Sequence, residues 1–294
     1  MSLALEKIVE DTTVELLRIA ATEFPVEYIR AIKEGLEDLV GSVGRAQIMN
    51  ILDNITLAQD RSKPMCQDTG IIAFLINVGD GFPIRSKVKE MLIKATRRST
   101  EIVPLRPNAV DIFKGNTGDN VGLNGHVPII YIDLVPGEDL EIIVMPKGGG
   151  STNVAAYRML KPSQGWRGIK QFVIEALAEA GSLACPPYFV GVGIGGGEDL
   201  CMTLAKKALL KPFKSRNENP DVSAIEYELL EKVNQLGIGV MGLGEGPTAL
   251  DLHIEIAARH PASLPVGLVI SCWALRHSRA LISAQGKVHI DKIA

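Results

Sequence analysis

Residues 63–70 read Lys-Pro-Met-Cys-Gln-Asp-Thr-Gly and run directly into Ile-Ile-Ala-Phe-Leu-Ile-Asn-Val at 71–78. The second part has the length and the β-branched and aromatic content of a buried strand. Pro64 and Gly70 bracket the first part as turn residues. The pattern predicts a loop that presents Cys66 and Asp68 at the start of a core strand, which is a rigid mount for chemistry. The alternative is a small buried cysteine without a chemical role.

The composition describes a chain that can bury a large core. Its 294 residues are 46% hydrophobic and 22% charged, which allows one or two domains. A net charge of −3 and a pI near 6.0 give no basic footprint for nucleic acid. The first residues are acidic where a signal peptide is basic, and no apolar run approaches the length of a membrane span. We therefore expect a soluble cytoplasmic protein.

Hydrophobic periodicity predicts one α/β domain over 1–294, with mixed β-sheets covered by helices. Residues 1–62 form its helical N-terminal part and 63–294 its α/β part. Helices are expected at 4–22, 26–41, 44–59, 85–102, from about 153, and at 166–180, 198–211 and 221–236. Strands are expected at 71–78, 127–135, 140–146, from 188, and at 251–258 and 266–272. The turn signal at 136–139 predicts that 127–135 and 140–146 form a hairpin.

Two glycine-rich stretches precede helices. Gly148, Gly149 and Gly150 leave backbone N–H groups open to an anion, although a plain connector explains them equally well. The run from Gly191 to Gly196 matches GxGxxG in form. No strand ending in an acidic residue follows about 20 positions later, so we reject a dinucleotide site. A nucleotide-dependent oxidoreductase is the competing hypothesis from another class, and measurable NAD binding would revive it.

Between Pro104 and Gly125 no regular pattern is present. A loop of this length inside a domain is usually functional or disordered, and its aliphatic content favours order. Arg106 lies in this loop, and an arginine fork is a natural partner for a carboxylate. A surface arginine without a role explains it equally well.

The four cysteines stand at 66, 185, 201 and 272, with no CxxC pair. This spacing does not favour a structural zinc site, and a reducing cytosol does not favour disulfides. Cys201 lies on an apolar helix face, which indicates packing. The other three each stand at the end of a strand or helix. They are either inert core residues or ligands of an iron–sulfur cluster with one iron left open.

Several motifs together resemble the class I (iron–sulfur) fumarate hydratase family. They are Lys-Pro-Met-Cys-Gln-Asp-Thr-Gly from 63, Gly-Asn-Thr-Gly-Asp-Asn from 115, Pro-Lys-Gly-Gly-Gly-Ser from 146, Cys-Pro-Pro from 185, Gly-Val-Gly-Ile-Gly-Gly from 191, and His-Pro-Ala-Ser-Leu-Pro from 260 before Cys-Trp at 272. The resemblance covers nearly the whole chain. In length the chain is similar to the α subunit of two-subunit members. The α subunits of L(+)-tartrate dehydratases share the pattern.

The resemblance implies a site as well as a fold. Cys66, Cys185 and Cys272 match the ligands of a [4Fe-4S] cluster, and Asp68 matches the acid that assists departure of hydroxide from (S)-malate. Gln67, Arg106, Gly149 and His260 match substrate-pocket positions. A lone histidine such as His260 is more often structural than catalytic.

The resemblance also implies an activity and a partner. The activity is reversible hydration of fumarate to (S)-malate, a reaction of the TCA cycle. The family's C-terminal catalytic part has no counterpart after Cys272, so a β subunit is expected to complete a hetero-oligomer. L(+)-tartrate dehydratase and a non-catalytic iron–sulfur binding module remain the alternatives.

Overall fold

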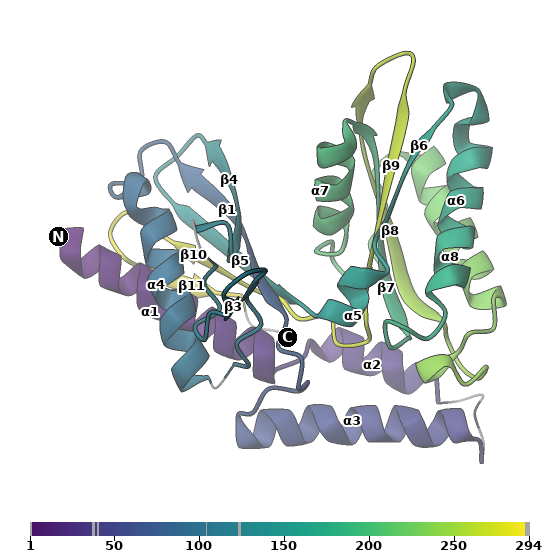
Figure 1. Cartoon of the computed structure of the whole chain (residues 1–294), viewed down its shortest axis with the longest axis horizontal. Helices are drawn as coiled ribbons and strands as arrows, with labels where there is room; N and C mark the ends of the chain where they lie inside the picture. Colours follow the sequence, from purple (N-terminus) through teal and green to yellow (C-terminus); the bar gives the residue numbers. More distant parts are fainter. Residues whose placement is uncertain (1, 37–38, 40, 104, 123–124, 292–294) are drawn as a thin grey trace. The chain divides into compact units, whose positions relative to one another are not determined.

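A computed structural model describes the chain except for residues 1, 37–38, 40, 104, 123–124 and 292–294. The chain groups into two compact units (Figure 1). The first contains Met1–Val26, Asp53–Gly149 and Arg276–Ala294, and the second contains Glu27–Leu52 and Gly150–Leu275. The expected α/β class with mixed sheets is confirmed. The expectation of a single domain over 1–294 stays a prediction.

The three N-terminal helices are α1 (Ser2–Thr22), α2 (Val26–Glu34) and α3 (Val43–Arg61), close to the predicted ranges. Helix α2 ends at Glu34 and Gly35 and Leu36 form a turn, so the predicted range 26–41 is too long; residues 37, 38 and 40 of that range lie outside the described residues. Among the helices that the structure describes, none combines the length and the apolar character that a bilayer span requires.

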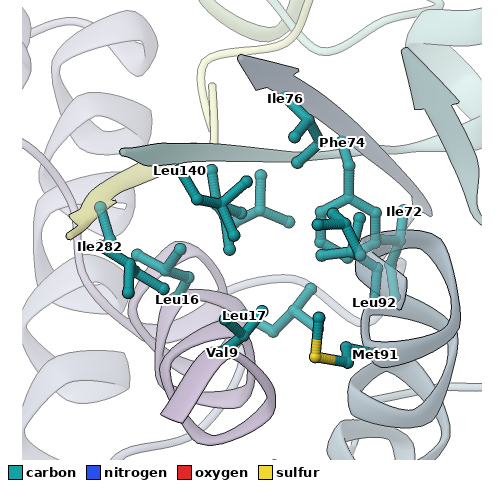
Figure 2. Packing of buried hydrophobic residues seen from close by; sticks show 14 of the residues in the cluster. Val9, Leu16, Leu17, Ile72, Phe74, Ile76, Met91, Leu92, Leu140 and Ile282 are labelled. Atoms are coloured by element: carbon teal, nitrogen blue, oxygen red, sulfur yellow. The ribbon is translucent and has the colours of Figure 1, made fainter. Parts of the chain in front are cut away.

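The first unit is built on a five-stranded mixed sheet in the order β11-β10-β5-β1-β4. Its strands are β1 (Ile71–Gly79), β4 (Ile129–Val135), β5 (Leu140–Lys147), β10 (Ser278–Ile282) and β11 (Val288–Ile290). Helix α4 (Val88–Ile102), preceded by the short 3-10 turn η1 (Arg85–Lys87), packs beside α1. Figure 2 shows side chains of α1 and α4 meeting those of β1, β5 and β10 in one apolar core.

The hairpin predicted from the turn at 136–139 is wrong. Strands β4 and β5 are both present, but β1 lies between them, parallel to β4 and antiparallel to β5. The turn accepts the end of β1 because Gly79 has no side chain: a Cβ there would lie 2.5 Å from the carbonyl oxygen of Gly137. A local turn signal predicts that the chain reverses its direction. It does not predict that another strand lies between the two strands that the turn connects.

The irregular segment 104–125 contains only two short strands, β2 (Val110–Asp111) and β3 (Gly115–Asn116), among its described residues. They pair with each other and leave Ile112 and Phe113 at an exposed tip. The order expected from its aliphatic content stays a prediction, and the described residues of the segment form internal hydrogen bonds. Examples are Asn116 Nδ2 to the carbonyl of Pro107 (2.8 Å) and the amide of Thr117 to the carbonyl of Ala109 (2.9 Å).

The second unit is built on a four-stranded sheet in the order β6-β9-β7-β8. Its strands are β6 (Ala156–Leu160), β7 (Tyr188–Gly196), β8 (Ala249–Arg259) and β9 (Leu264–Ser271). Its helices are α6 (Gly165–Ala180), α7 (Glu198–Ala208) and α8 (Pro220–Gln235), with short 3-10 turns η3 (Pro162–Gln164) and η4 (Val240–Gly242). Helix α7 covers one face of the sheet, and α6 and α8 cover the other (Figure 1).

The glycines of β7 serve helix packing. A Cβ on Gly191 would overlap the carbonyl oxygen of Ala205, and one on Gly193 would overlap that of Cys201. Glycine therefore lets α7 lie directly on the strand. This packing accounts for the GxGxxG pattern without a nucleotide.

The helix expected from about 153 is wrong in place and extent. Helix α5 begins at Gly149 and ends at Asn153, and the edge strand β6 follows. Strands β6, β10 and β11 were not predicted from the sequence. They are short, at three to five residues each, and such runs leave too few positions for a period to be recognised.

Candidate active site

The carboxylate of Asp68 is held in a frame of hydrogen-bond donors in the first unit. Oδ2 accepts the backbone N–H of Gly149 (2.6 Å). Oδ1 accepts the N–H of Gly70 (2.9 Å) and, at 3.4 Å, the side-chain amide of Asn108. The side chain remains partly exposed. An ionised carboxylate only accepts hydrogen bonds, so these three donors match it.

Pairing of β1 with β5 creates this frame. Ile71 pairs with Lys147, which places the residues before β1 opposite those after β5. Gly70 has φ +83°, and a Cβ there would lie 2.7 Å from the backbone of Lys147. Glycine is therefore required where the loop turns into the strand. This close approach brings Asp68 to the first residue of α5.

Gln67 and Arg106 lie in the same unit and both are exposed. The backbone of Arg106 is fixed, because its carbonyl accepts Thr69 Oγ1 (3.2 Å) and Asn120 Nδ2 (3.1 Å). The Arg106 segment is thus tied to the loop that carries Asp68, as the side chain of Thr69 belongs to that loop. The structure brings Gln67, Asp68, Gly149 and the Arg106 segment together in the first unit.

Two further residues contact this frame and were not predicted. Besides its bond to Asp68, Asn108 donates to the carbonyl of Gly70 (3.2 Å). Arg276, which is 3% exposed, donates from Nη1 to the carbonyl oxygen of Asp68 (2.8 Å). The sequence signal that could have pointed to Asn108 is its place in the irregular segment, two residues after Arg106. Arg276 follows the motif Cys-Trp-Ala-Leu, but a single arginine in a sequence does not reveal a partner 208 residues away.

Cys185 and Cys272 lie on neighbouring segments of the second unit. The amide of Trp273 donates to the carbonyl of Cys185 (3.2 Å). Cys185 is exposed and has φ +53°, a left-handed conformation that costs about 1–2 kcal/mol for a non-glycine residue. Cys272, which follows the end of β9, is partly exposed. Burial raises the pKa of the adjacent Tyr188 to about 12, with smaller contributions from the charges of both thiols.

The other predicted residues are placed as follows. Cys66 is a free, partly exposed thiol of the first unit, and Cys201 is fully buried in α7, as its apolar surroundings predicted. His260 is exposed in the loop after β8, where its Nδ1 accepts the amide of Ala262 (3.1 Å). Within the described part of the chain, no group of three or more His, Cys, Asp or Glu side chains is arranged to hold a metal ion. The cysteine triad and the role of His260 stay predictions.

Comparison with known proteins gives a consistent result. The sequence profile of the family described as "Fumarate hydratase (Fumerase)" matches residues 10–281. A Methanocaldococcus jannaschii protein, named provisionally as an L(+)-tartrate dehydratase subunit alpha, is 42% identical over 95% of this chain and 99% of its own length. The L(+)-tartrate dehydratase subunit alpha of Escherichia coli K12 is 38% identical over 90% of this chain and 87% of its own. The chain therefore belongs to the fumarate hydratase (Fumerase) family.

Proposed function

We propose that this chain is the α subunit of an iron–sulfur hydro-lyase that adds water to, or removes it from, a small dicarboxylic acid. Fumarate and (S)-malate are the substrate pair that the motifs imply. The observation that carries the proposal is the Asp68 carboxylate, which is fixed by two backbone N–H groups and yet partly exposed. A group held in this way can exchange a proton with a substrate without first being reorganised.

Oδ2 of Asp68 is the atom that would transfer the proton. It accepts one hydrogen bond from the described part of the chain, so a lone pair remains. In the hydration direction this oxygen accepts a proton from the attacking water. In the dehydration direction it returns the proton to the departing hydroxyl group. The absence of a side chain at Gly148 keeps this oxygen open, since a Cβ there would lie 2.9 Å from it.

Arg106, Gln67 and His260 would bind the substrate. The exposed guanidinium of Arg106 offers two parallel N–H groups to a carboxylate, and its backbone is already fixed by Thr69 and Asn120. The exposed amide of Gln67 can donate to a substrate oxygen or accept from one. Gly149 contributes through its N–H, which orients Asp68.

Cys66, Cys185 and Cys272 would hold a [4Fe-4S] cluster. The donor chemistry fits, because all three side chains carry a thiol with some exposure and thiolates are the usual ligands of such clusters. The left-handed backbone of Cys185 supports a functional position, since strain of this kind is retained where the surrounding structure requires it. When bound, a cluster with one iron not ligated by protein supplies a Lewis acid for the substrate hydroxyl group.

The relatives named as α subunits support a β subunit that completes a hetero-oligomer. Their names also favour L(+)-tartrate as a second candidate substrate, and a role in the TCA cycle holds only for fumarate. The described residues form no disulfide, which is consistent with the cytoplasm, where thiols stay reduced.

The first experiment tests the cluster. Anaerobic reconstitution with iron and sulfide is expected to give brown protein with visible absorption, and Cys272→Ala is expected to abolish it. Cys201→Ala is the matched control, because its thiol is buried in helix packing and the variant should keep the absorption. Equal absorption in both variants would contradict the proposed ligand set.

The second experiment tests the reaction. The chain is assembled with its β subunit, loaded with cluster, and assayed for turnover of (S)-malate and of L(+)-tartrate in separate reactions. A higher kcat/KM for one acid decides between the two substrates. A loaded complex that turns over neither acid supports the non-catalytic iron–sulfur module instead.

A further inference from the structure

We propose that Arg276 is a positioning residue of the hydro-lyase site: its buried guanidinium fixes the peptide that carries Asp68 and thereby aims the Asp68 carboxylate. This inference rests on the proposed function for its catalytic consequence. Its geometry stands on the first unit alone, to which both residues belong.

The contact is made to the main chain rather than to the carboxylate. Nη1 of Arg276 donates to the carbonyl oxygen of Asp68 at 2.8 Å. This fixes the peptide between Asp68 and Thr69, directly before the left-handed turn at Gly70. The direction of the Asp68 side chain follows from that peptide, and with it the bonds that Oδ1 and Oδ2 accept from Gly70 and Gly149.

The charge of Arg276 is unusual for its burial. Among the described residues no carboxylate forms an ion pair with it, and its Nε has no hydrogen-bond partner. Burial of an unpaired charge is costly, so an arginine with only a structural role would be expected to have an acidic partner. A side-chain position that is unfavourable for stability indicates a use in the site.

The surroundings of Gly148 show that the Arg276 guanidinium lies near the Asp68 carboxylate. A Cβ on Gly148 would lie 2.9 Å from Oδ2 of Asp68 and 3.5 Å from Nη2 of Arg276. The carboxylate and the guanidinium therefore border the same small space beside a residue without a side chain. Arg276 therefore fixes the backbone of Asp68 through its carbonyl oxygen, and Oδ2, the oxygen that would transfer the proton, remains open.

The chain offers a matched control in Arg216. Its guanidinium is also largely buried and its Nε also lacks a partner among the described residues, but Nη1 donates to Asp251 at 2.8 Å. Arg216 is therefore a buried arginine with an acidic partner, remote in sequence from any predicted site residue. Its replacement should affect stability without any selective effect on the Asp68 frame.

The test uses the full chain with Arg276→Met, Arg276→Lys and, as control, Arg216→Met. Hydrogen exchange measured by mass spectrometry on peptides that cover Gly70 and Gly149 is expected to rise about three- to tenfold in Arg276→Met, the effect of losing the hydrogen bonds of those amides. Amides within β1 and α4 should be unchanged. Arg276→Lys, which keeps a charged donor, should show a smaller rise, and this variant decides the question if Arg276→Met does not fold.

The kinetic arm uses the complete, loaded complex. In Arg276→Met kcat is expected to fall about a hundredfold while KM changes less than about threefold, because a misaimed group affects the reaction more than binding. Unchanged exchange at Gly70 and Gly149, or exchange that rises uniformly through β1 and α4, overturns the proposal. A wild-type complex without activity overturns only the proposed function, because the exchange arm still reports whether Arg276 fixes Asp68.

Discussion

Two aspartates of this protein occupy opposite environments. Asp251 is 1% exposed, and its carboxylate accepts the amide of Lys214 (2.6 Å), Nη1 of Arg216 (2.8 Å) and the amide of Leu252 (2.9 Å). Nε2 of His253 lies 3.3 Å from it. Asp68 is partly exposed, and Oδ2 accepts a single donor among the residues that the structure describes.

The nearby arginines differ in the same way. Arg216 has Asp251 as its acidic partner, whereas Arg276, among the described residues, donates its hydrogen bond to a carbonyl oxygen and forms no ion pair. Glu226 extends the first arrangement by accepting the amides of Ile254 and Asn217, which attaches the segment before α8 to β8. The charged groups of the Asp251 network are therefore paired with one another, although Nε of Arg216 has no partner among the described residues. The Asp68 frame keeps an acceptor open at Oδ2, and the buried charge of Arg276 has no acidic partner among the described residues. This difference in charge pairing distinguishes a site from a structural network.

Replacement of the two aspartates should separate activity from stability. Asp68→Asn is expected to lower kcat of the complete complex about 10²–10⁴-fold, because the amide cannot take up a proton from water. Its thermal midpoint should stay close to that of the wild type, since the side chain is partly exposed. Steady-state kinetics with the preferred acid measures the effect, and wild-type turnover in Asp68→Asn would remove Asp68 from the mechanism.

Asp251→Asn should have the reverse effect. The NH2 group of the asparagine would face another donor, either the backbone N–H of Lys214 or the Arg216 guanidinium. Removing one partner of a buried ion pair lowers the free energy of unfolding by about 3–5 kcal/mol. Both tryptophans, Trp166 and Trp273, lie in the second unit, so their fluorescence reports its unfolding in urea. Turnover per folded molecule should be retained.

Two adjacent glycines sharpen the comparison on the Asp68 side. Gly148→Ala places a methyl group 2.9 Å from Oδ2, whereas Gly149→Ala places one at 3.6 Å, an ordinary contact. We expect Gly148→Ala to lower kcat about a hundredfold by displacing the carboxylate, and Gly149→Ala to have an effect below about threefold. The matched pair excludes a general effect of alanine in this turn. Equal losses of kcat in both variants would show that activity does not depend on the free space beside Oδ2.

The sequence predicted the elements of this protein better than their pairing. The apolar run at 71–78 reported β1 because period and residue type are local properties. The turn at 136–139 could not report that β1 inserts between β4 and β5, because that depends on a glycine 58 residues before Gly137, at Gly79. Helix α5 is too short for a period to be visible.

The site shows the same limit. Asp68 and Gly149 were predicted through motifs, and the structure joins them by a hydrogen bond. Asn108 and Arg276 carry no motif of their own. Their importance lies in partners 40 and 208 residues distant, which only the folded chain brings together. The proposed ligand set of Cys66, Cys185 and Cys272 also joins residues that are far apart in the sequence, and it stays a prediction.

The smallest expected effect concerns His253, on the Asp251 side of the comparison. Burial lowers the pKa of His253 below its ordinary value of 6.5, against the opposing charges of Asp251 and Glu226, while Arg216 lowers it further. The unfolded chain therefore binds a proton at His253 more readily than the folded chain does. Above about pH 6.5 the ring is neutral in both states, and as the pH falls below that value stability is lost by at most about 1.4 kcal/mol per pH unit.

His253→Gln should remove this dependence, because glutamine keeps a donor for the carbonyl of Ser215 and does not titrate. The measurement is the urea unfolding free energy, followed by tryptophan fluorescence between about pH 5 and 8, as the difference between variant and wild type, so that other titrating groups cancel. The difference should grow in favour of the variant only as the medium becomes acidic. A difference independent of pH would mean that His253 acts by packing alone and that the network around Asp251 is not sensitive to protons.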